Sequence, residues 1–272
     1  MKSTDIYFLA MSHTIQRLGR NKNAYLGETV DINRILQDGL AAAREYHWQI
    51  EEIPVSEKPA LFAFRRPAES VDRRSPKIYI STGIHGDEPA GPLAVCELLR
   101  QNCWPADADI WLCPCLNPTG FPLNRRENAD GVDLNRDYRH LKSAEVRAHV
   151  AWLEKQPRFD LALCLHEDWE AHGFYVYEVN PDDEPSLSGK MIEAVSKVCP
   201  IDLSPIIEDR PARGGIIRPD LDPAQRPQWP EAFYLIMNKT RHSYTLEAPS
   251  DFPLPARVAA LVAAARAVLA EI

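Results

Sequence analysis

The sequence predicts an α/β fold in which helices cover both faces of a mixed, mostly parallel central β-sheet. Short apolar runs alternate with longer segments of helical periodicity along the chain, as in proteins built from alternating strands and helices. Several of these runs are rich in β-branched and aromatic residues, which is typical of buried strands. No internal repeat, low-complexity segment or linker divides the 272 residues, so we expect one domain spanning residues 1–272.

The N-terminal part of the chain is expected to form a helix followed by two short strands. Residues 31–47 place apolar side chains on one face at helical spacing, which is typical of an amphipathic helix. The short apolar runs 49–55 and 61–65 are predicted to be strands. A loop rich in proline and charged residues, 66–77, then leads into the central strand.

The rest of the chain is organised around the stretch 77–91, KIYISTGIHGDEPAG. Its first residues have the composition of a buried strand, and a Thr-Gly pair ends that strand. His85 and Glu88 follow on the turn, and Pro89 is tolerated in the first turn of the next helix, which ends near Gln101. His85 and Glu88 are therefore predicted at the edge of an open α/β sheet, where such sheets bind ligands.

The middle of the chain is predicted to contain two strands, a helix and one long loop. The strand 110–115 leads into residues 117–141, which have neither helical nor strand periodicity. Long loops of this kind inside compact domains are usually functional. Residues 143–156 are predicted to be a helix with Ser143 as its N-cap, and 160–166 (DLALCLH) is a strand that ends on a histidine.

The C-terminal part continues the alternation. A strand is predicted at 174–179 and a helix at 187–198. Residues 208–230 are rich in proline, glycine and arginine and are predicted to be a second long loop. A strand at 243–246 and a helix at 255–272 follow.

Composition narrows the function classes. The hydrophobic content of 45% is that of a globular chain, and the net charge of −8 argues against nucleic acid or an anionic membrane as a partner. The apolar run 6–11 is too short for a secretory signal, and no apolar stretch reaches the length of a membrane span. We therefore expect a soluble, cytoplasmic protein.

Cys113 and Cys115 are expected as buried reduced thiols on one face of a strand, with a disulfide or a soft-metal site as the alternative.

Residues with metal-binding chemistry follow two of the predicted strands. His85-x-x-Glu88 comes after the first strand, and His166 ends another. Two imidazoles and a carboxylate are the ligand set of several zinc hydrolases, which leave one position open for water. Taken singly, each motif has an ordinary explanation, because His-x-x-Glu occurs on surface turns and a histidine often ends a strand as a core or capping residue.

The order of the motifs resembles that of the zinc carboxypeptidase family. Asn-Pro-Thr-Gly at 117–120, the pair Arg125-Arg126, Gly-Val-Asp-Leu-Asn-Arg at 131–136, His166 and Thr-Leu-Glu at 245–247 follow the first motif in that order. This arrangement resembles carboxypeptidase A and its relatives, whose superfamily includes succinylglutamate desuccinylase and aspartoacylase. The resemblance covers most of the chain and implies a zinc carboxypeptidase-like catalytic domain.

The resemblance also implies a role for individual residues. It implies one zinc ion per chain, whose ligands are His85, Glu88 and His166. It makes Glu247 the general base, and it makes Asn135 and Arg136 the clamp for a substrate carboxylate. Arg126 is the implied oxyanion-stabilising arginine, although Arg125 adjoins it and the family spaces this residue variably.

The residue types suit these roles. A carboxylate such as Glu247 can take a proton from water and pass it to a leaving nitrogen. The planar fork of Arg136 can hold a carboxylate through two hydrogen bonds, and Asn135 adds an uncharged donor. The ordinary alternatives are a capping or ion-paired carboxylate for Glu247, a surface salt bridge for Arg136 and an exposed cation for Arg126.

Two departures from the carboxypeptidase A pattern concern acidic residues and tyrosine. Glu167 and Asp168 follow the second histidine and make the rim more acidic, and Asp168 is expected to orient a ligand histidine, unless it is simply a solvated acid. No catalytic tyrosine is assigned. Tyr244 should point to the sheet face opposite Glu247, and Tyr234 should be part of the core.

The predicted function is zinc-dependent hydrolysis of an amide bond next to a free carboxylate in a small peptide. An N-acyl amino acid deacylase is the alternative, but aspartoacylase-type proteins carry a further β domain, whereas only 25 residues follow Glu247. A zinc- or carboxylate-binding protein without activity is a third possibility, against which the presence of Glu247 argues. Specificity is expected to come from 208–230, and the oligomeric state is not predicted.

Overall fold

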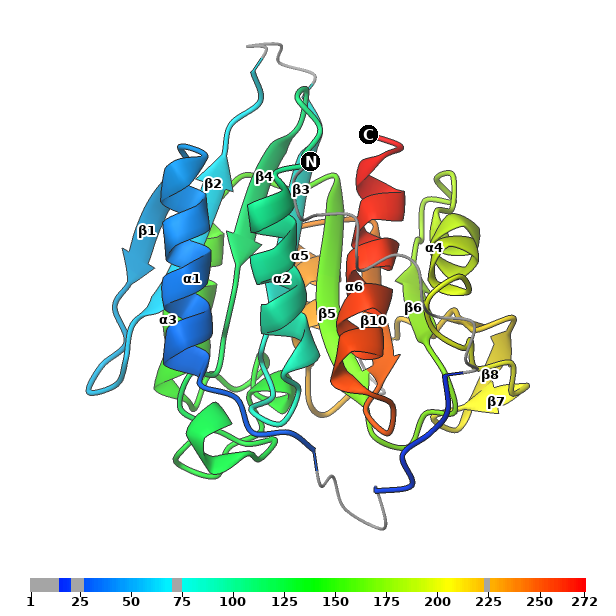
Figure 1. Ribbon diagram of the computed structural model, residues 1–272. Helices are drawn as coiled ribbons and strands as arrows, with labels where there is room; N and C mark the ends of the chain where they lie inside the picture. The colour runs from blue at the N-terminus through cyan, green and yellow to red at the C-terminus, as the bar shows by residue number, and fades with distance from the viewer. Residues whose placement is uncertain (1–14, 21–26, 70–74, 223–225) are drawn as a thin grey trace, which may run out of the picture.

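The computed structural model describes residues 15–20, 27–69, 75–222 and 226–272 (Figure 1). The predicted α/β fold is confirmed: one mixed sheet runs through the molecule, and helices cover both of its faces. The apolar run 6–11 lies outside the described residues. Among the described residues, no helix combines the length and the apolar character needed to cross a membrane.

Ten strands form the sheet in the order β1-β2-β4-β3-β5-β10-β6-β9-β8-β7. These strands are β1 (Gln49–Ile53), β2 (Leu61–Arg66), β3 (Lys77–Thr82), β4 (Asp109–Cys113), β5 (Leu161–Asp168), β6 (Tyr175–Val179), β7 (Ile206–Ile207), β8 (Arg210–Arg213), β9 (Ile216–Ile217) and β10 (Ser243–Pro249). The central strands β4, β3, β5 and β10 are parallel to one another, and β2 and β6 flank them in antiparallel orientation.

The helices form two layers. These helices are α1 (Ile32–Glu45), α2 (Ala90–Gln101), α3 (Ala144–Lys155), α4 (Ser188–Val195), α5 (Glu231–Asn238) and α6 (Leu254–Leu269), with short 3₁₀ turns η1 (Phe121–Leu123) and η2 (Leu134–Arg136). Figure 1 shows α1, α2, α6 and α4 on the near face of the sheet, with α3 and α5 behind it. The predicted N-cap Ser143 is confirmed, because its side chain accepts a hydrogen bond from the backbone of Val146.

Strand alternation decides which side chains reach which layer. In β3, Ile78 and Ile80 join the core under α1, α2, α4 and α6, whereas Tyr79 joins the core on the α3 side. β10 follows the same rule, since Tyr244 and Leu246 belong to the first core. Glu247 therefore projects from the other face, on the side of α5, and the expectation that Tyr244 points away from it is confirmed.

The site forms where the chain changes direction across the sheet. From β3 the chain passes through α2 to β4 on one side, and from β4 it passes through α3 to β5 on the other side of β3. Crossovers in opposite directions leave a crevice beyond the carboxyl ends of β3 and β5. A close backbone contact supports this crevice, because a β-carbon on Gly86 would lie 2.2 Å from the carbonyl carbon of Gly120. The turn after β3 thus packs directly on the Asn-Pro-Thr-Gly turn.

The structure corrects the prediction that 208–230 is only a loop. β8 and β9 lie within it and extend the sheet beyond β6. A two-residue turn, Glu208-Asp209, joins β7 to β8, and both residues have positive φ, 50° and 56°. Such turns favour Asn-Gly, so Glu-Asp gives no turn signal in the sequence.

One smaller expectation, about the cysteine pair, also changes. Cys113 and Cys115 are buried free thiols as predicted, but β4 ends at Cys113, so the pair does not share one strand face. Cys113 belongs to the core on the α3 side, and Cys115 packs beside Phe121 and Ile32.

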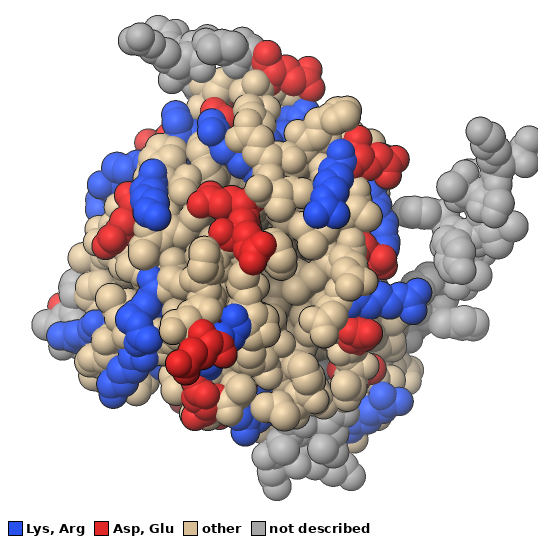
Figure 2. All heavy atoms as spheres, turned by 90° about the vertical axis from the view of Figure 1, so that its left-hand side faces the viewer, with Lys and Arg blue, Asp and Glu red and all other residues tan. Residues whose placement is uncertain are grey.

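Figure 2 shows acidic and basic side chains interspersed on the face that carries the β1 edge, which is the ordinary pattern of a solvated surface.

Candidate metal centre and substrate pocket

Three of the predicted site residues form one buried cluster, called here the metal cluster: His85, Glu88 and His166. His85 and Glu88 lie on the turn between β3 and α2, and His166 lies in β5. Their ligand atoms all lie within 4.8 Å of one another. The three residues are 2%, 5% and 4% exposed, so the cluster is shielded from bulk water.

The geometry of the metal cluster suits a cation. Nδ1 of His85 lies 2.5 Å from Glu88 Oε1, and Nδ1 of His166 lies 3.0 Å from Glu88 Oε2. Burial alone would raise the pKa of Glu88, but the two imidazoles hold it well below its usual range. Two nitrogens and a carboxylate that converge out of water can exchange their shared protons for a metal ion, and two histidines with one glutamate form a known zinc ligand set. The residues present therefore fit a bound zinc ion.

Asp133 organises the surroundings of the metal cluster, a role that the sequence interpretation did not give it. Its Oδ1 lies 3.3 Å from Nε2 of His85, and its Oδ2 accepts a 2.8 Å hydrogen bond from Nε of Arg126. Oδ1 also accepts from the backbone N–H of Asn135 and so begins η2. Burial alone would raise the pKa of Asp133, but the neighbouring imidazole of His85 and the charge of Arg126 hold it well below its usual range. A carboxylate on the second nitrogen of a ligand histidine fixes the orientation of its ring.

Arg126 and Arg125 occupy different environments. Nη1 of Arg126 lies 3.3 Å from Nδ1 of His85 and 3.8 Å from Glu88 Oε1, so its guanidinium adjoins the metal cluster. Nη2 of Arg125 instead donates to the carbonyl oxygens of Asn128 and Ala129, at 2.7 and 3.0 Å. Of these two neighbours, Arg126 alone lines the cavity described below.

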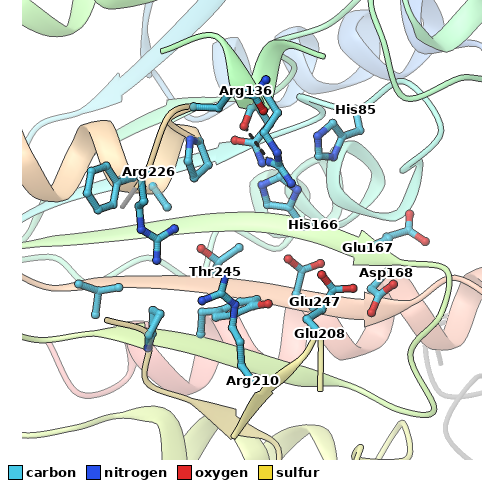
Figure 3. A pocket seen from close by; sticks show the side chains of 18 of the residues that line it. His85, Arg136, His166, Glu167, Asp168, Glu208, Arg210, Arg226, Thr245 and Glu247 are labelled. Carbon is cyan, nitrogen blue, oxygen red and sulfur yellow. Dashed lines mark hydrogen bonds between the residues drawn. The ribbon is translucent and has the colours of Figure 1, made fainter. Parts of the chain in front are cut away.

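Glu247 lies beside the metal cluster. In β10 it is in register with His166 of β5, and both side chains project toward the cavity (Figure 3). Burial raises the pKa of Glu247 well above its ordinary value, the nearby His166 opposes this, and the carboxylates Glu88 and Asp168 reinforce it. A bound dication would offset the repulsion between these carboxylates.

Asp168 does not orient a ligand histidine, contrary to expectation. Its Oδ2 accepts a 3.1 Å hydrogen bond from the hydroxyl of Tyr175, and its Oδ1 accepts from the backbone N–H of Glu170. Asp168 is the last residue of β5, and its carboxylate is bound by Tyr175 of β6 instead of a ligand histidine. Asp133 contacts a ligand histidine instead.

Glu167, next to His166, supports the site from the opposite face of the sheet. Its Oε1 accepts a 2.6 Å hydrogen bond from the backbone N–H of Ala90, at the start of α2. Its Oε2 pairs with Arg257 of α6, and Arg257 also pairs with Glu28. Both side chains of the Glu167–Arg257 pair are fully buried, so the start of α2 is tied to α6 through charged groups without access to water.

The predicted clamp residues, Asn135 and Arg136, lie on η2, and Asn135 is held by the start of α5. Oδ1 of Asn135 accepts a 2.8 Å hydrogen bond from the backbone N–H of Glu231, which leaves its amide N–H groups as donors. The guanidinium of Arg136 donates to the carbonyl oxygen of Asn135 at 2.9 Å.

Tyr234, which was predicted to be part of the core, is buried among core residues on this side of the sheet.

One cavity of about 580 Å³ connects these groups. It contains the metal cluster, Glu247, Arg126 and the clamp residues at its wall. Two further arginines line it, Arg210 of β8 and Arg226, and we call Arg136, Arg210 and Arg226 the arginine cluster (Figure 3). The expectation that 208–230 contributes to the pocket wall is thus confirmed.

Comparison with known proteins confirms the resemblance drawn from the motifs. The succinylglutamate desuccinylase/aspartoacylase catalytic domain family matches residues 74–202. Carboxypeptidase SOL1 of Arabidopsis thaliana is 32% identical over 104 residues, which cover 30% of this chain and 21% of that protein. The match therefore spans about a fifth of that relative's length.

Solved structures extend the likeness to nearly the whole chain. A protein from Shewanella amazonensis, provisionally named a metallopeptidase, is 25% identical with a TM-score of 0.74, covering 87% of this chain and 91% of its own. A metallo-carboxypeptidase from Burkholderia cenocepacia is 17% identical with a TM-score of 0.66, covering 89% of this chain and 69% of its own, and shares the fold. The chain is thus similar to hydrolases of the metallopeptidase and amidase superfamily.

Proposed function

We propose that this protein is a zinc-dependent hydrolase that cleaves an amide bond next to a free carboxylate, as carboxypeptidases do. The observation that carries the proposal is the meeting, in one cavity, of the metal cluster, the carboxylate of Glu247 and the Asn135-Arg136 pair. Each of these groups serves a separate requirement of the reaction. The proposal assigns residues 1–272 to one catalytic domain.

His85, Glu88 and His166 would hold one zinc ion. When bound, zinc polarises the amide carbonyl and lowers the pKa of a water molecule toward about 7. Asp133 keeps the ring of His85 in the orientation in which Nδ1 faces Glu88, 2.5 Å away. The protein thereby supplies an oriented ligand set before the substrate binds.

Glu247 is the proposed general base. It accepts a proton from the attacking water and transfers it to the leaving nitrogen, so that the amine departs in its neutral form. A raised pKa suits the second of these transfers, because a more basic carboxylate holds the proton until the nitrogen needs it. Arg126, beside the metal cluster, is the proposed donor to the oxygen on which negative charge develops.

Asn135 and Arg136 are the proposed carboxylate clamp. Arg136 offers a planar pair of donors that matches a carboxylate, and Asn135 offers amide N–H groups because Glu231 occupies its oxygen. A substrate held by its terminal carboxylate presents the adjacent amide to the catalytic groups. Holding the amide in this way converts a bimolecular encounter into a positioned reaction.

A deacylase that releases a short acyl group from an amino acid is the second candidate. The match to the succinylglutamate desuccinylase/aspartoacylase family over residues 74–202 favours it. Both candidates hold a free carboxylate beside the scissile amide. They differ in what lies on the other side of that amide, a peptide or a short acyl group.

Substrate comparison with the zinc-loaded protein tests the proposal. N-blocked dipeptides, the matching C-terminal amides and N-acetyl or N-succinyl amino acids with the same terminal residue would be compared by kcat/KM. We expect the dipeptide acids to be hydrolysed and their amides to be poor substrates. Hydrolysis of short acyl derivatives alone would establish the deacylase instead, and equal turnover of acid and amide would contradict the carboxylate clamp. Loss of activity with a chelator and its return with zinc is the accompanying control.

A further inference from the structure

A fully buried carboxylate lies behind the clamp and takes no part in the proposed reaction. Glu231 is the first residue of α5, and it is 1% exposed. Its neighbours Pro230 and Ala232 line the cavity, whereas Glu231 does not, because its side chain is directed toward β3 instead. A carboxylate taken out of water is costly unless hydrogen bonds replace those that water made.

Two hydroxyl groups of β3 hold the carboxylate of Glu231. The hydroxyl of Tyr79 donates to Oε1 at 2.8 Å, and the hydroxyl of Ser81 donates to Oε2 at 2.9 Å. Residues two apart on a strand face the same side, so β3 presents both donors together. Burial raises the pKa of Glu231, and these two hydrogen bonds oppose the rise. The start of α5 is thus fixed to the strand that leads to His85.

The hydrogen bonds continue from Tyr79 into α3. The hydroxyl of Tyr79 lies 2.9 Å from Nε2 of His149, and the hydroxyl of Tyr138 lies 2.7 Å from Nδ1 of the same ring. Burial lowers the pKa of His149 to about 3, so the ring is neutral at pH 7. Because Tyr79 donates its proton to Glu231, Nε2 carries the proton of the ring and Nδ1 accepts from Tyr138. We call Tyr138, His149, Tyr79, Ser81 and Glu231 the buried network. A buried network whose polar atoms all have partners makes the core rigid.

The backbone N–H of Glu231 connects the buried network to the clamp. As the first N–H of α5 it has no acceptor within the helix, and it donates to Oδ1 of Asn135 at 2.8 Å. The carboxamide of Asn135 has two orientations related by a half-turn, and the other one would place an N–H group against this donor. The N–H of Glu231 therefore selects the orientation in which the amide donors of Asn135 are free for a ligand in the cavity.

We propose that Glu231 is a positioning residue for the carboxylate clamp: Tyr79 and Ser81 fix its side chain, and its backbone N–H orients the amide of Asn135. This inference rests on the proposed function, because it takes Asn135 to bind the terminal carboxylate of the substrate. Glu231 does not touch the substrate and acts only through Asn135. The clamp is thereby ordered before the substrate binds, which reduces the entropy lost on binding.

The test compares an N-blocked dipeptide acid with its C-terminal amide in the zinc-loaded protein. Glu231→Ala removes the acceptor of both hydroxyls, so the N–H that orients Asn135 is no longer held in place. We expect KM for the acid to rise by about 3- to 10-fold, the range for one hydrogen bond, with little change in kcat. KM for the amide should change less, and the zinc content should stay normal. Glu231→Gln should keep the parent's KM, because its carboxamide can accept from Tyr79 and donate to Ser81.

A double-mutant cycle shows whether Glu231 acts through Asn135. Asn135→Ala alone should raise KM for the acid at least as much as Glu231→Ala does. Adding Glu231→Ala to Asn135→Ala should then bring no further rise, because the group that Glu231 orients is already gone. Effects that multiply in the double variant would overturn the inference. Ser81→Ala removes a single hydroxyl and provides the same cycle if Glu231→Ala does not fold.

Glu178→Ala is the matched control for the loss of a buried glutamate. Glu178 is 2% exposed and accepts hydrogen bonds from the hydroxyls of Tyr244 and Ser188, at 3.2 and 2.8 Å, but it lies outside the cavity. This variant should lose stability and keep the parent's KM for the acid. An equal rise of KM in Glu178→Ala and Glu231→Ala would reflect general damage and would overturn the inference.

The same measurements separate failure of the inference from failure of the proposed function. A parent that prefers the acid, together with an unchanged KM in Glu231→Ala, would overturn the inference and leave the proposed hydrolase intact. Equal turnover of acid and amide by the parent would contradict the clamp itself and therefore both proposals. If the parent hydrolyses neither compound, calorimetry measures their binding. Tighter binding of the acid that is weakened in Glu231→Ala, but not further in the double variant, would support the inference without turnover, and equal affinities in the parent would overturn it.

Discussion

In the metal cluster each histidine faces an oxygen of Glu88, and Asp133 contacts the remaining nitrogen of His85. In the arginine cluster, at the other part of the same cavity, hydrogen bonds from the guanidinium groups reach only carbonyl oxygens. The first group is organised before anything binds, whereas the second carries charge that a ligand must compensate. Under the proposed function, the first group performs the chemistry and the second recognises the substrate, so substitutions in the two clusters should have different effects on zinc content and on substrate preference.

The largest expected effect comes from the metal cluster. His166→Ala removes a ligand, so we expect bound zinc to fall from one per chain to a small fraction and hydrolysis to fall to background. Metal analysis after dialysis and an activity assay measure both. His172→Ala is the control, because His172 is an exposed histidine outside the cavity. Near-stoichiometric zinc in the His166 variant would contradict the ligand assignment.

The next effect separates chemistry from metal binding at the same end of the cavity. Glu247→Gln keeps size and hydrogen bonding but cannot accept a proton. We expect it to retain zinc and substrate affinity while kcat falls by about 10²- to 10⁴-fold. Glu170→Gln, a change of an exposed glutamate, is the control. Normal turnover by Glu247→Gln would show that this carboxylate is structural.

In the arginine cluster, Arg136→Ala should lose recognition while the zinc content stays normal. Loss of a charge-assisted contact to a substrate carboxylate costs about 2–5 kcal/mol, so kcat/KM for dipeptide acids should fall steeply. The matching C-terminal amides should change little, and Arg136→Lys should recover part of the loss. Arg213→Ala serves as the control, since Arg213 is an exposed arginine of β8 outside the cavity. An equal loss for acids and amides would mean that Arg136 supports the fold rather than the carboxylate.

Asp133→Asn tests whether the metal cluster is organised in advance. Removing the carboxylate from Nε2 of His85 should weaken zinc affinity by about 10- to 100-fold without abolishing it. Competition with a calibrated zinc chelator measures the affinity. Asp130→Asn, in the same loop but half exposed to solvent and outside the cavity, is the control. Unchanged affinity in Asp133→Asn would show that ring orientation does not depend on this residue.

The smallest effect concerns a fully paired carboxylate away from the metal cluster. Burial alone would raise the pKa of Glu178, but the nearby imidazole of His242, a hydrogen bond from Ser188 and the charge of Arg218 lower it to about 2, from an ordinary 4.5. Its contribution to stability is therefore present above about pH 4.5 and is lost as the pH falls toward 2.

Replacing Glu178 by Gln should remove that pH dependence. We expect a loss of about 2 kcal/mol in the free energy of unfolding at pH 7 and a smaller difference from the parent at pH 2–3. Urea unfolding in the presence of a chelator excludes metal effects, and Glu193→Gln, an exposed change, is the control. A difference that stays constant from pH 7 to pH 2.5 would contradict the assignment.

The sheet centre and the metal cluster were predictable because both follow from strand geometry. Carboxyl ends of parallel strands meet at one edge, so a histidine after β3 and another in β5 had to lie close together. Side-chain alternation along β10 was enough to place Glu247 and Tyr244 on opposite faces of the sheet, without knowing which strands lie beside β10. The motif order also pointed to Asn135 and Arg136 of η2, which line the same cavity.

The parts that escaped prediction depend on contacts between segments distant in sequence. Asp133 binds His85 and Arg126 at once, and nothing in its own neighbourhood distinguishes it from a turn residue. The β7–β8 turn uses Glu208 and Asp209 with positive φ, where local propensity favours Asn-Gly. The placement of Arg210 in the cavity follows from that turn, so this wall of the cavity was less predictable than the metal cluster.

The Glu167–Arg257 pair also limits how far the protein could be shortened. A fragment consisting of residues 74–202, the part that matches the family, would keep His85, Glu88 and His166 but would lack α6. Glu167 would then lose its cation at the start of α2, and the apolar core that α6 covers would be exposed to water. Any shortened fragment that is to keep the metal cluster therefore needs the C-terminal helix, although that helix contributes no residue to the cluster.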